Sequence, residues 1–128
     1  HDLNVLIDLG KWWNGRTENW PMPLGGNVVR RDLGQTVMED ITKYTKMSIE
    51  FAIQSPTEAL EFAKAWGRGI DDETNREFVS MYVNDRTIDY RDEGRSSIRQ
   101  FIQEGQELGL IRSSFDVNEI DFIGAPEQ

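Results

Sequence analysis

The chain has 128 residues and a formal net charge of −9, from 14 basic and 23 acidic side chains. This length fits one domain with one core, and the negative charge argues against binding to nucleic acid or to anionic membranes. Cysteine is absent and the single histidine is His1. The interior of the chain therefore cannot form a disulfide, a thiolate or multi-histidine metal site, or a Ser-His-Asp triad. Such a chain is a weak candidate for a complete enzyme.

The start of the chain is abrupt. A natural start usually has a methionine and some slack before its first strand, whereas the apolar run Val5–Ile7 follows His1 almost at once. We therefore expect that the chain was cut from a longer one or that His1 is foreign to it. No stretch approaches the roughly 20 apolar residues of a membrane span, and a cytoplasmic location is the default expectation.

Three short segments have the composition of β-strands. Residues 3–7 form an apolar run, residues 24–31 form a second run with a glycine-softened entry, and residues 119–123 form a possible third. The prolines at positions 21 and 23 make the segment before the second strand irregular. No helix separates the first two strands, so they cannot build a self-contained parallel sheet. The domain is then either helix-rich with a small sheet, or it lacks the remaining strands.

Four helices are predicted after residue 34. The first spans residues 35–53. The second starts with a capping box of Ser55 and Glu58 around Pro56 and runs to Trp66. The third starts at Asp71-Asp72, whose carboxylates suit a helix N-terminus, and buries Phe78, Val79, Tyr82 and Val83. The fourth spans residues 91–108 and ends at Gly109; Gly94 and Gly105 on its buried stripe predict close backbone packing.

Three local patterns have both a structural and a functional interpretation. Leu24-Gly25-Gly26-Asn27 lacks the Lys-Ser/Thr of a phosphate loop; it is either a turn or a backbone that approaches a ligand closely. The cluster of Trp12, Trp13 and Trp20 either packs a loop on the core or stacks on an aromatic ligand. Arg30-Arg31-Asp32 is either a solvated ion pair or a partner for a ligand carboxylate.

Two long motifs resemble a known family. They are Asp8-Leu9-Gly10-Lys11-Trp12-Trp13 and, after a short spacer, the run from Pro21 to Gly34 that contains Pro-Leu-Gly-Gly-Asn-Val-Val-Arg-Arg-Asp-Leu. Residues 82–85, Asp89-Tyr90, residues 93–95 and residues 109–111 continue the match in order and spacing. The chain resembles the C-terminal half of the 1,4-dihydroxy-6-naphthoate synthase family of menaquinone biosynthesis.

The resemblance implies an α/β, helix-rich, partial periplasmic-binding-protein-like (type II) fold with two or three strands followed by about four helices. Residues 1–128 would be a single partial domain. Within it, residues 1–33 would be the end of the second lobe and the crossover strand, and residues 34–128 the C-terminal helices that pack on a missing first lobe. Ligands of this fold sit between the lobes, near the crossovers.

The resemblance also implies a lyase-type reaction of the futalosine pathway, from cyclic dehypoxanthine futalosine to 1,4-dihydroxy-6-naphthoate, with no metal or organic cofactor. Such a reaction needs a base that takes a proton from carbon. In the family that base is thought to be a histidine that precedes the matched segment. We assign no catalytic residue and no metal ligand to this chain. The expected substrate-binding residues are Pro23, Leu24, Gly25 and Gly26, with Arg30 as a carboxylate partner.

Two functional hypotheses follow. In the first, the chain is the C-terminal portion of such an enzyme, inactive alone, and binds a small-molecule carboxylate once the missing lobe is supplied. In the second, it is a stand-alone binding or interaction module that kept part of the fold and lost the chemistry. The second hypothesis predicts a compact monomer or symmetric dimer. In the first, helix faces left uncovered predict homo-oligomers or domain swapping, and no nucleic-acid or membrane partner is expected.

Overall fold

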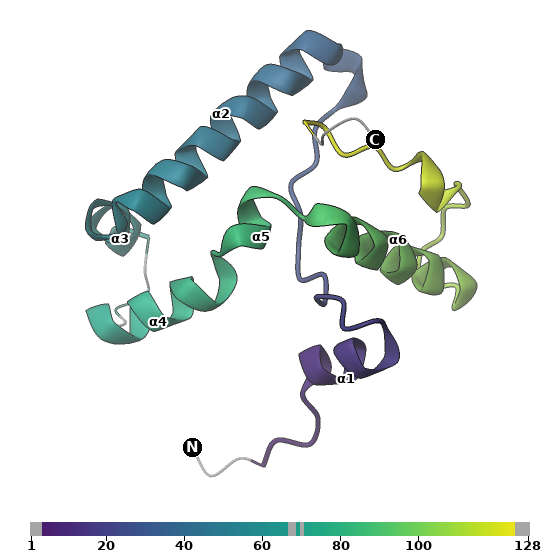
Figure 1. Cartoon of the computed structure of the whole chain (residues 1–128), viewed down its shortest axis with the longest axis horizontal. Coiled ribbons are helices and arrows are strands. Elements are labelled where there is room, and N and C mark those ends of the chain that lie inside the picture. Colours follow the sequence, from purple (N-terminus) through teal and green to yellow (C-terminus); the bar gives the residue numbers. More distant parts are fainter. Residues whose placement is uncertain (1–3, 67–68, 70, 125–128) are drawn as a thin grey trace. The chain divides into compact units, whose positions relative to one another are not determined.

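The structure is a computed structural model that describes residues 4–66, 69 and 71–124, and these residues form two compact units (Figure 1). The first unit combines residues 4–28 with 90–122. The second combines the described residues of 29–89 with 123–124. No helix within these ranges is both long enough and apolar enough to cross a membrane.

Three helices build the first unit: α1 (Leu9–Arg16), α6 (Arg91–Glu107) and the 3-10 helix η2 (Val117–Glu119). Helix α1 begins where the Asp8 carboxylate accepts a hydrogen bond from the Lys11 backbone N–H at 3.0 Å. The Trp13 side chain is buried and meets the Phe101 ring edge-on at a centroid distance of 5.6 Å. The core of this unit therefore lies between α1 and α6.

The end of α6 is fixed by glycine. Gly109 has a positive φ of 69°, which lets the chain reverse so that the backbone N–H groups of Leu110 and Ile111 both donate to the Gly105 carbonyl at 2.9 Å. A Cβ on Gly105 would lie 2.8 Å from Ile111 Cδ1, and one on Gly94 would lie 3.0 Å from Tyr90 Cβ. The predicted close packing at Gly94 and Gly105 is confirmed.

The second unit is a chain of helices: η1 (Arg31–Leu33), α2 (Gln35–Gln54), α3 (Pro56–Lys64), α4 (Asp72–Tyr82) and α5 (Asp85–Ile88). Helix α2 contacts η1, α3 and α5, and α3 contacts α4. Met38 and Leu60 are its buried apolar side chains among the described residues. The Lys64 ammonium bridges Glu61 at 2.5 Å and Asp72 at 2.8 Å, which ties the end of α3 to the start of α4.

Of the two predicted helix starts, the one at α3 is partly wrong and the one at α4 is confirmed. Pro56 does occupy the first turn of α3, but Ser55 makes no side-chain cap bond, so the predicted capping box is wrong. Ser55 instead ends α2, with its backbone N–H donating to the Phe51 carbonyl at 2.8 Å. Asp71 caps α4 as predicted by accepting from the Thr74 backbone N–H.

The predicted strands are wrong. Residues 4–8 and 20–30 have no regular secondary structure, residues 117–119 form η2, and no strand occurs within the described ranges. The expected α/β fold with two or three strands is therefore replaced by an arrangement of helices and extended segments. A strand requires a neighbour to accept its backbone hydrogen bonds, and neither extended segment has one here. The prolines at 21 and 23 also lack the N–H that a ladder needs.

Many large apolar side chains of the second unit are exposed. Phe78 and Tyr82, predicted to be buried, are each 51% exposed, and their ring centroids are 4.9 Å apart. The exposed residues of α2, α3 and α4 are Val37, Ile41, Tyr44, Met47, Phe51, Ile53, Phe62, Phe78, Met81 and Tyr82. The amphipathic patterns thus predicted the helices correctly but not what their apolar faces contact.

Candidate functional site

A buried hydrogen-bond chain joins three separate segments of the first unit. The Trp13 indole N–H donates to Ser97 Oγ at 2.8 Å, and Ser97 Oγ donates to the Pro21 carbonyl at 2.7 Å. Ser97 is 0% exposed and Trp13 is 1% exposed. Hydrogen bonds shielded from water in this way are costly to break, because the remaining partner stays unsatisfied. These two hydrogen bonds therefore fix where the extended segment after α1 passes over α6.

The expected substrate-binding residues Pro23, Leu24, Gly25 and Gly26 follow this anchor directly. Pro23 is half-buried, Leu24 is 72% exposed, and both glycines are exposed. A Cβ on Gly26 would lie 3.4 Å from the Tyr90 hydroxyl, so this part of the segment passes beside that ring. Residues 24–26 are thus exposed on the first unit beside the half-buried Pro23, and these four residues are called the strip below.

Tyr90 is itself held in place by the C-terminal segment. Its ring meets the Phe122 ring edge-on at 6.0 Å, and the Arg99 guanidinium lies over the Phe122 ring at 5.0 Å. Arg99 also donates to the Ile120 carbonyl at 3.3 Å, which attaches residues 120–122 to α6. Contacts from both ends of the chain therefore support the strip.

Arg30, the expected carboxylate partner, belongs to the second unit. Its Nε and Nη2 donate to the two carboxylate oxygens of Asp32 at 2.9 and 2.5 Å. The Asp32 carboxylate raises the pKa of Arg30, and the guanidinium lowers the pKa of Asp32. Both side chains are largely exposed, at 78% and 63%, so Arg30 and Asp32 form the solvated ion pair that the sequence analysis gave as the structural interpretation.

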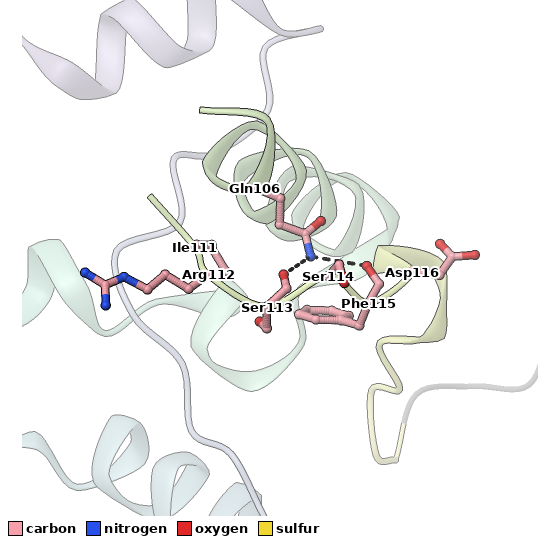
Figure 2. A pocket seen from close by; sticks show the side chains of 7 residues that line it. All are labelled: Gln106, Ile111, Arg112, Ser113, Ser114, Phe115 and Asp116. Atoms are coloured by element: carbon pink, nitrogen blue, oxygen red, sulfur yellow. Dashed lines mark hydrogen bonds between the residues drawn. The ribbon is translucent and has the colours of Figure 1, made fainter. Parts of the chain in front are cut away.

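A hollow of about 400 Å³ lies elsewhere on the first unit, between the end of α6 and the loop that follows (Figure 2). The Gln106 amide nitrogen donates to the carbonyls of Ser113 and Phe115 at 2.9 and 3.2 Å. In Figure 2 the charged ends of Arg112 and Asp116 point away from this amide. The Gln106 amide is thus already bonded to the two carbonyls in the hollow. None of the residues that line the hollow belongs to the strip.

The candidate residues present two kinds of group to solvent. The strip offers apolar surface and bare backbone, and Arg30 offers a charged fork that suits a carboxylate. Within the part of the chain that the structure describes, no three acidic or histidine side chains converge in a way that would hold a metal ion.

Comparison with known proteins identifies the family. The family model described as menaquinone biosynthesis matches residues 1–107. The chain belongs to this family. One curated relative, the 1,4-dihydroxy-6-naphthoate synthase of Thermus thermophilus, is 33% identical over 114 residues, which cover 89% of this chain and 42% of the relative. The enzyme of the same name from Streptomyces coelicolor is 25% identical over 111 residues, which cover 87% of this chain and 39% of the relative.

This member of the menaquinone biosynthesis family thus spans about two-fifths of the length of the curated relatives it matches. No solved structure matches it. Residues of the motifs that carried the resemblance make contacts within the first unit: Trp13 bonds to Ser97, and Gly26 and Gly94 both lie beside Tyr90. The family membership predicted from these motifs is confirmed.

Two residues of the site were missed by the sequence analysis. Ser97 was not placed on the predicted buried stripe of α6, although it lies three positions after Gly94 and four before Phe101, which were; a buried polar group requires a hydrogen-bond partner. Tyr90 lies in a motif of the resemblance, but its contact with Gly26 joins positions 64 apart. Stripe periodicity could have identified the first residue, whereas the second contact depends on the fold.

Proposed function

We propose that this chain is the C-terminal portion of an enzyme resembling 1,4-dihydroxy-6-naphthoate synthase and that it is inactive alone. The observation that carries the proposal is the match of 89% of the chain, at 33% identity, to a synthase of which it covers 42%. The reaction proposed is the conversion of cyclic dehypoxanthine futalosine to 1,4-dihydroxy-6-naphthoate in the cytoplasm.

The proposed division of labour assigns binding to this chain and proton transfer to the remaining portion of the enzyme. Removal of a proton from carbon needs a base held close to that carbon. The chain has no histidine beyond His1, so a histidine base has to come from outside it. The strip from Pro23 to Gly26 would form one wall of the substrate site, and Arg30 would pair with a substrate carboxylate.

The exposed apolar faces of the second unit support the need for a covering surface. Ile41, Tyr44 and Phe51 on α2 are 42%, 64% and 58% exposed, and they share one face of the helix. Soluble proteins bury such stripes against another element or a partner. The remaining portion of the enzyme is the proposed cover, and without it the chain is expected to self-associate.

A reconstitution assay tests the proposal. The chain is mixed with a separately produced N-terminal portion of the Thermus thermophilus relative, and loss of substrate and formation of naphthoate are followed. The mixture is expected to turn over, and each half alone is not. A soluble mixture without turnover, together with a lone chain that is a compact and stable monomer, contradicts the proposal and favours the stand-alone binding module.

The role of Arg30 has its own control in the same assay. Arg30→Gln is expected to raise KM by about tenfold, because a charged hydrogen bond to the substrate is lost. Arg112→Gln changes charge equally but lies in the hollow after α6, and it should leave KM unchanged. Equal effects of the two variants would remove Arg30 from the site.

A further inference from the structure

Ser97 is in an unusual position for a serine. It is 0% exposed, and its hydroxyl both accepts from the Trp13 indole and donates to the Pro21 carbonyl. A serine hydroxyl has one proton and two lone pairs. Because the indole N–H occupies one lone pair, the proton is directed toward the carbonyl. Both hydrogen bonds are used inside the protein, so the hydroxyl is not placed to act as a nucleophile.

The extended segment of residues 21–28 is held to α6 by this hydroxyl. The bond from Ser97 to the Pro21 carbonyl ties the start of its backbone to the helix. Pro21 and Pro23 have no N–H to donate, and Gly25 and Gly26 have no side chain to pack. Further along the segment Gly26 passes beside Tyr90, where an added Cβ would lie 3.4 Å from the hydroxyl.

We infer that Ser97 is a positioning residue for substrate binding. It holds the Pro21 carbonyl at a fixed place on α6, and so sets where the strip from Pro23 to Gly26 faces the substrate. Trp13 supports it by fixing the direction of the hydroxyl. The inference rests on the proposed function for its substrate, but the positioning of the strip is a property of the chain itself.

Steady-state kinetics give the first test. In a full-length chimera, this chain replaces the matched segment of the Thermus thermophilus synthase, and KM and kcat are measured for Ser97→Ala, Trp13→Phe and Ser96→Ala. Ser97→Ala is expected to raise KM about tenfold, the equivalent of one lost hydrogen bond, with kcat little changed. Trp13→Phe keeps the bond to Pro21 and should raise KM less. Ser96→Ala is the neighbouring serine control and should change neither.

A merely structural role of Ser97 predicts the opposite result, a lower apparent kcat with an unchanged KM. If Ser97 only stabilises the fold, Ser97→Ala lowers the folded fraction and with it the apparent kcat, while the KM of the folded molecules stays at its original value. An unchanged KM in Ser97→Ala therefore overturns the inference. If the chimera with the original Ser97 shows no turnover at all, the proposed function fails, and the second test decides the positioning role separately.

The second test needs no activity. Nuclear Overhauser contacts are recorded in the chain between Gly26 and the Tyr90 ring, and between the Trp13 and Phe101 rings as a reference for the core. Ser97→Ala is expected to lose the Gly26–Tyr90 contact and to keep the reference, whereas Ser96→Ala keeps both. Retention of the Gly26–Tyr90 contact in Ser97→Ala, or loss of both contacts together, overturns the inference.

Discussion

The indole N–H of Trp13 donates a 2.8 Å hydrogen bond to the hydroxyl of Ser97, 84 positions later in the chain, and both side chains are fully buried. The same indole ring packs edge-on against Phe101 one turn further along α6. Through this pair the first helix of the chain is attached to the last long one. This pair is therefore one of the contacts that fix the geometry of the first unit.

Substitution of Trp13 measures both parts of this attachment. Trp13→Ala is expected to destabilise the chain by about 3–5 kcal/mol, because a large buried ring is removed and a cavity remains. Trp13→Phe keeps most of the apolar contact but loses the N–H, with an expected cost of about 1–2 kcal/mol. Urea unfolding followed by circular dichroism gives both values. Equal costs for the two variants would show that the ring contributes little beyond its hydrogen bond.

Gly105 is expected to resist alanine although it lies inside a helix. Alanine normally stabilises such a position by about 1 kcal/mol. Here the new methyl would lie 2.8 Å from Ile111 Cδ1 and 3.0 Å from its Cγ1. We expect a net destabilisation of about 1 kcal/mol for Gly105→Ala. Ile111→Val removes the nearer atom and should recover part of the loss in the double variant.

The control for this prediction is Gly15 in α1. A Cβ there meets nothing within 4 Å, so Gly15→Ala should show the ordinary stabilisation. Thermal midpoints of the four variants, measured side by side, check the prediction. A Gly105→Ala protein as stable as Gly15→Ala would contradict the close packing at the end of α6.

The loop after α6 depends on the Gln106 amide, which donates to the carbonyls of Ser113 and Phe115. Gln106→Ala is expected to cost about 1 kcal/mol, the usual net value of one hydrogen bond in a partly exposed place. Gln106→Glu keeps the shape but points a carboxylate oxygen at the carbonyls, so it should cost more than alanine at neutral pH. A glutamate variant as stable as the native chain would show that the amide does not hold the loop.

The start of α4 should respond to acid. The Thr74 backbone N–H bonds to the Asp71 carboxylate and lowers its pKa in the folded chain. A lowered folded pKa means that the cap stabilises the helix above the unfolded value of about 3.9, and that this stabilisation is lost as the pH falls through the folded pKa. The Thr74 amide shift should therefore change in this acidic range and stay constant near neutrality.

The substitution Asp71→Asn is the matched control for this acid response. Asparagine caps a helix without a titratable group, so α4 should persist and the acid-dependent change at Thr74 should disappear. An identical pH profile in Asp71→Asn would show that another group near the helix start causes the change.

Local patterns predicted the four longer helices after residue 34 well, because helix signals are short-range, but the short helix α5 was not predicted. The predicted spans 35–53 and 91–108 match α2 and α6 within one residue at each end, and Asp71 caps α4 as expected. Helix α1 is missing from the sequence-based expectations because Asn14-Gly15 is typical of a turn, although Asp8 three positions before Lys11 is a recognisable cap.

The strands were mispredicted for a different reason. An apolar run such as Val5–Ile7 forms a strand only when another strand pairs with it, and the sequence of the run contains no information on that partner. The side chains of these three residues are 58–95% exposed. The expected strip from Pro23 to Gly26 was located by its glycines and by the family motif, whereas its anchor at Ser97 is a contact over 76 positions that no local pattern reveals.

The central claim is that this chain supplies part of a naphthoate synthase, and turnover by the full-length chimera tests it most directly. We predict that the Thermus thermophilus synthase with its matched segment replaced by this chain converts cyclic dehypoxanthine futalosine to 1,4-dihydroxy-6-naphthoate. We also predict that this chain alone does not. A folded, soluble chimera that neither binds nor converts the substrate would contradict the account.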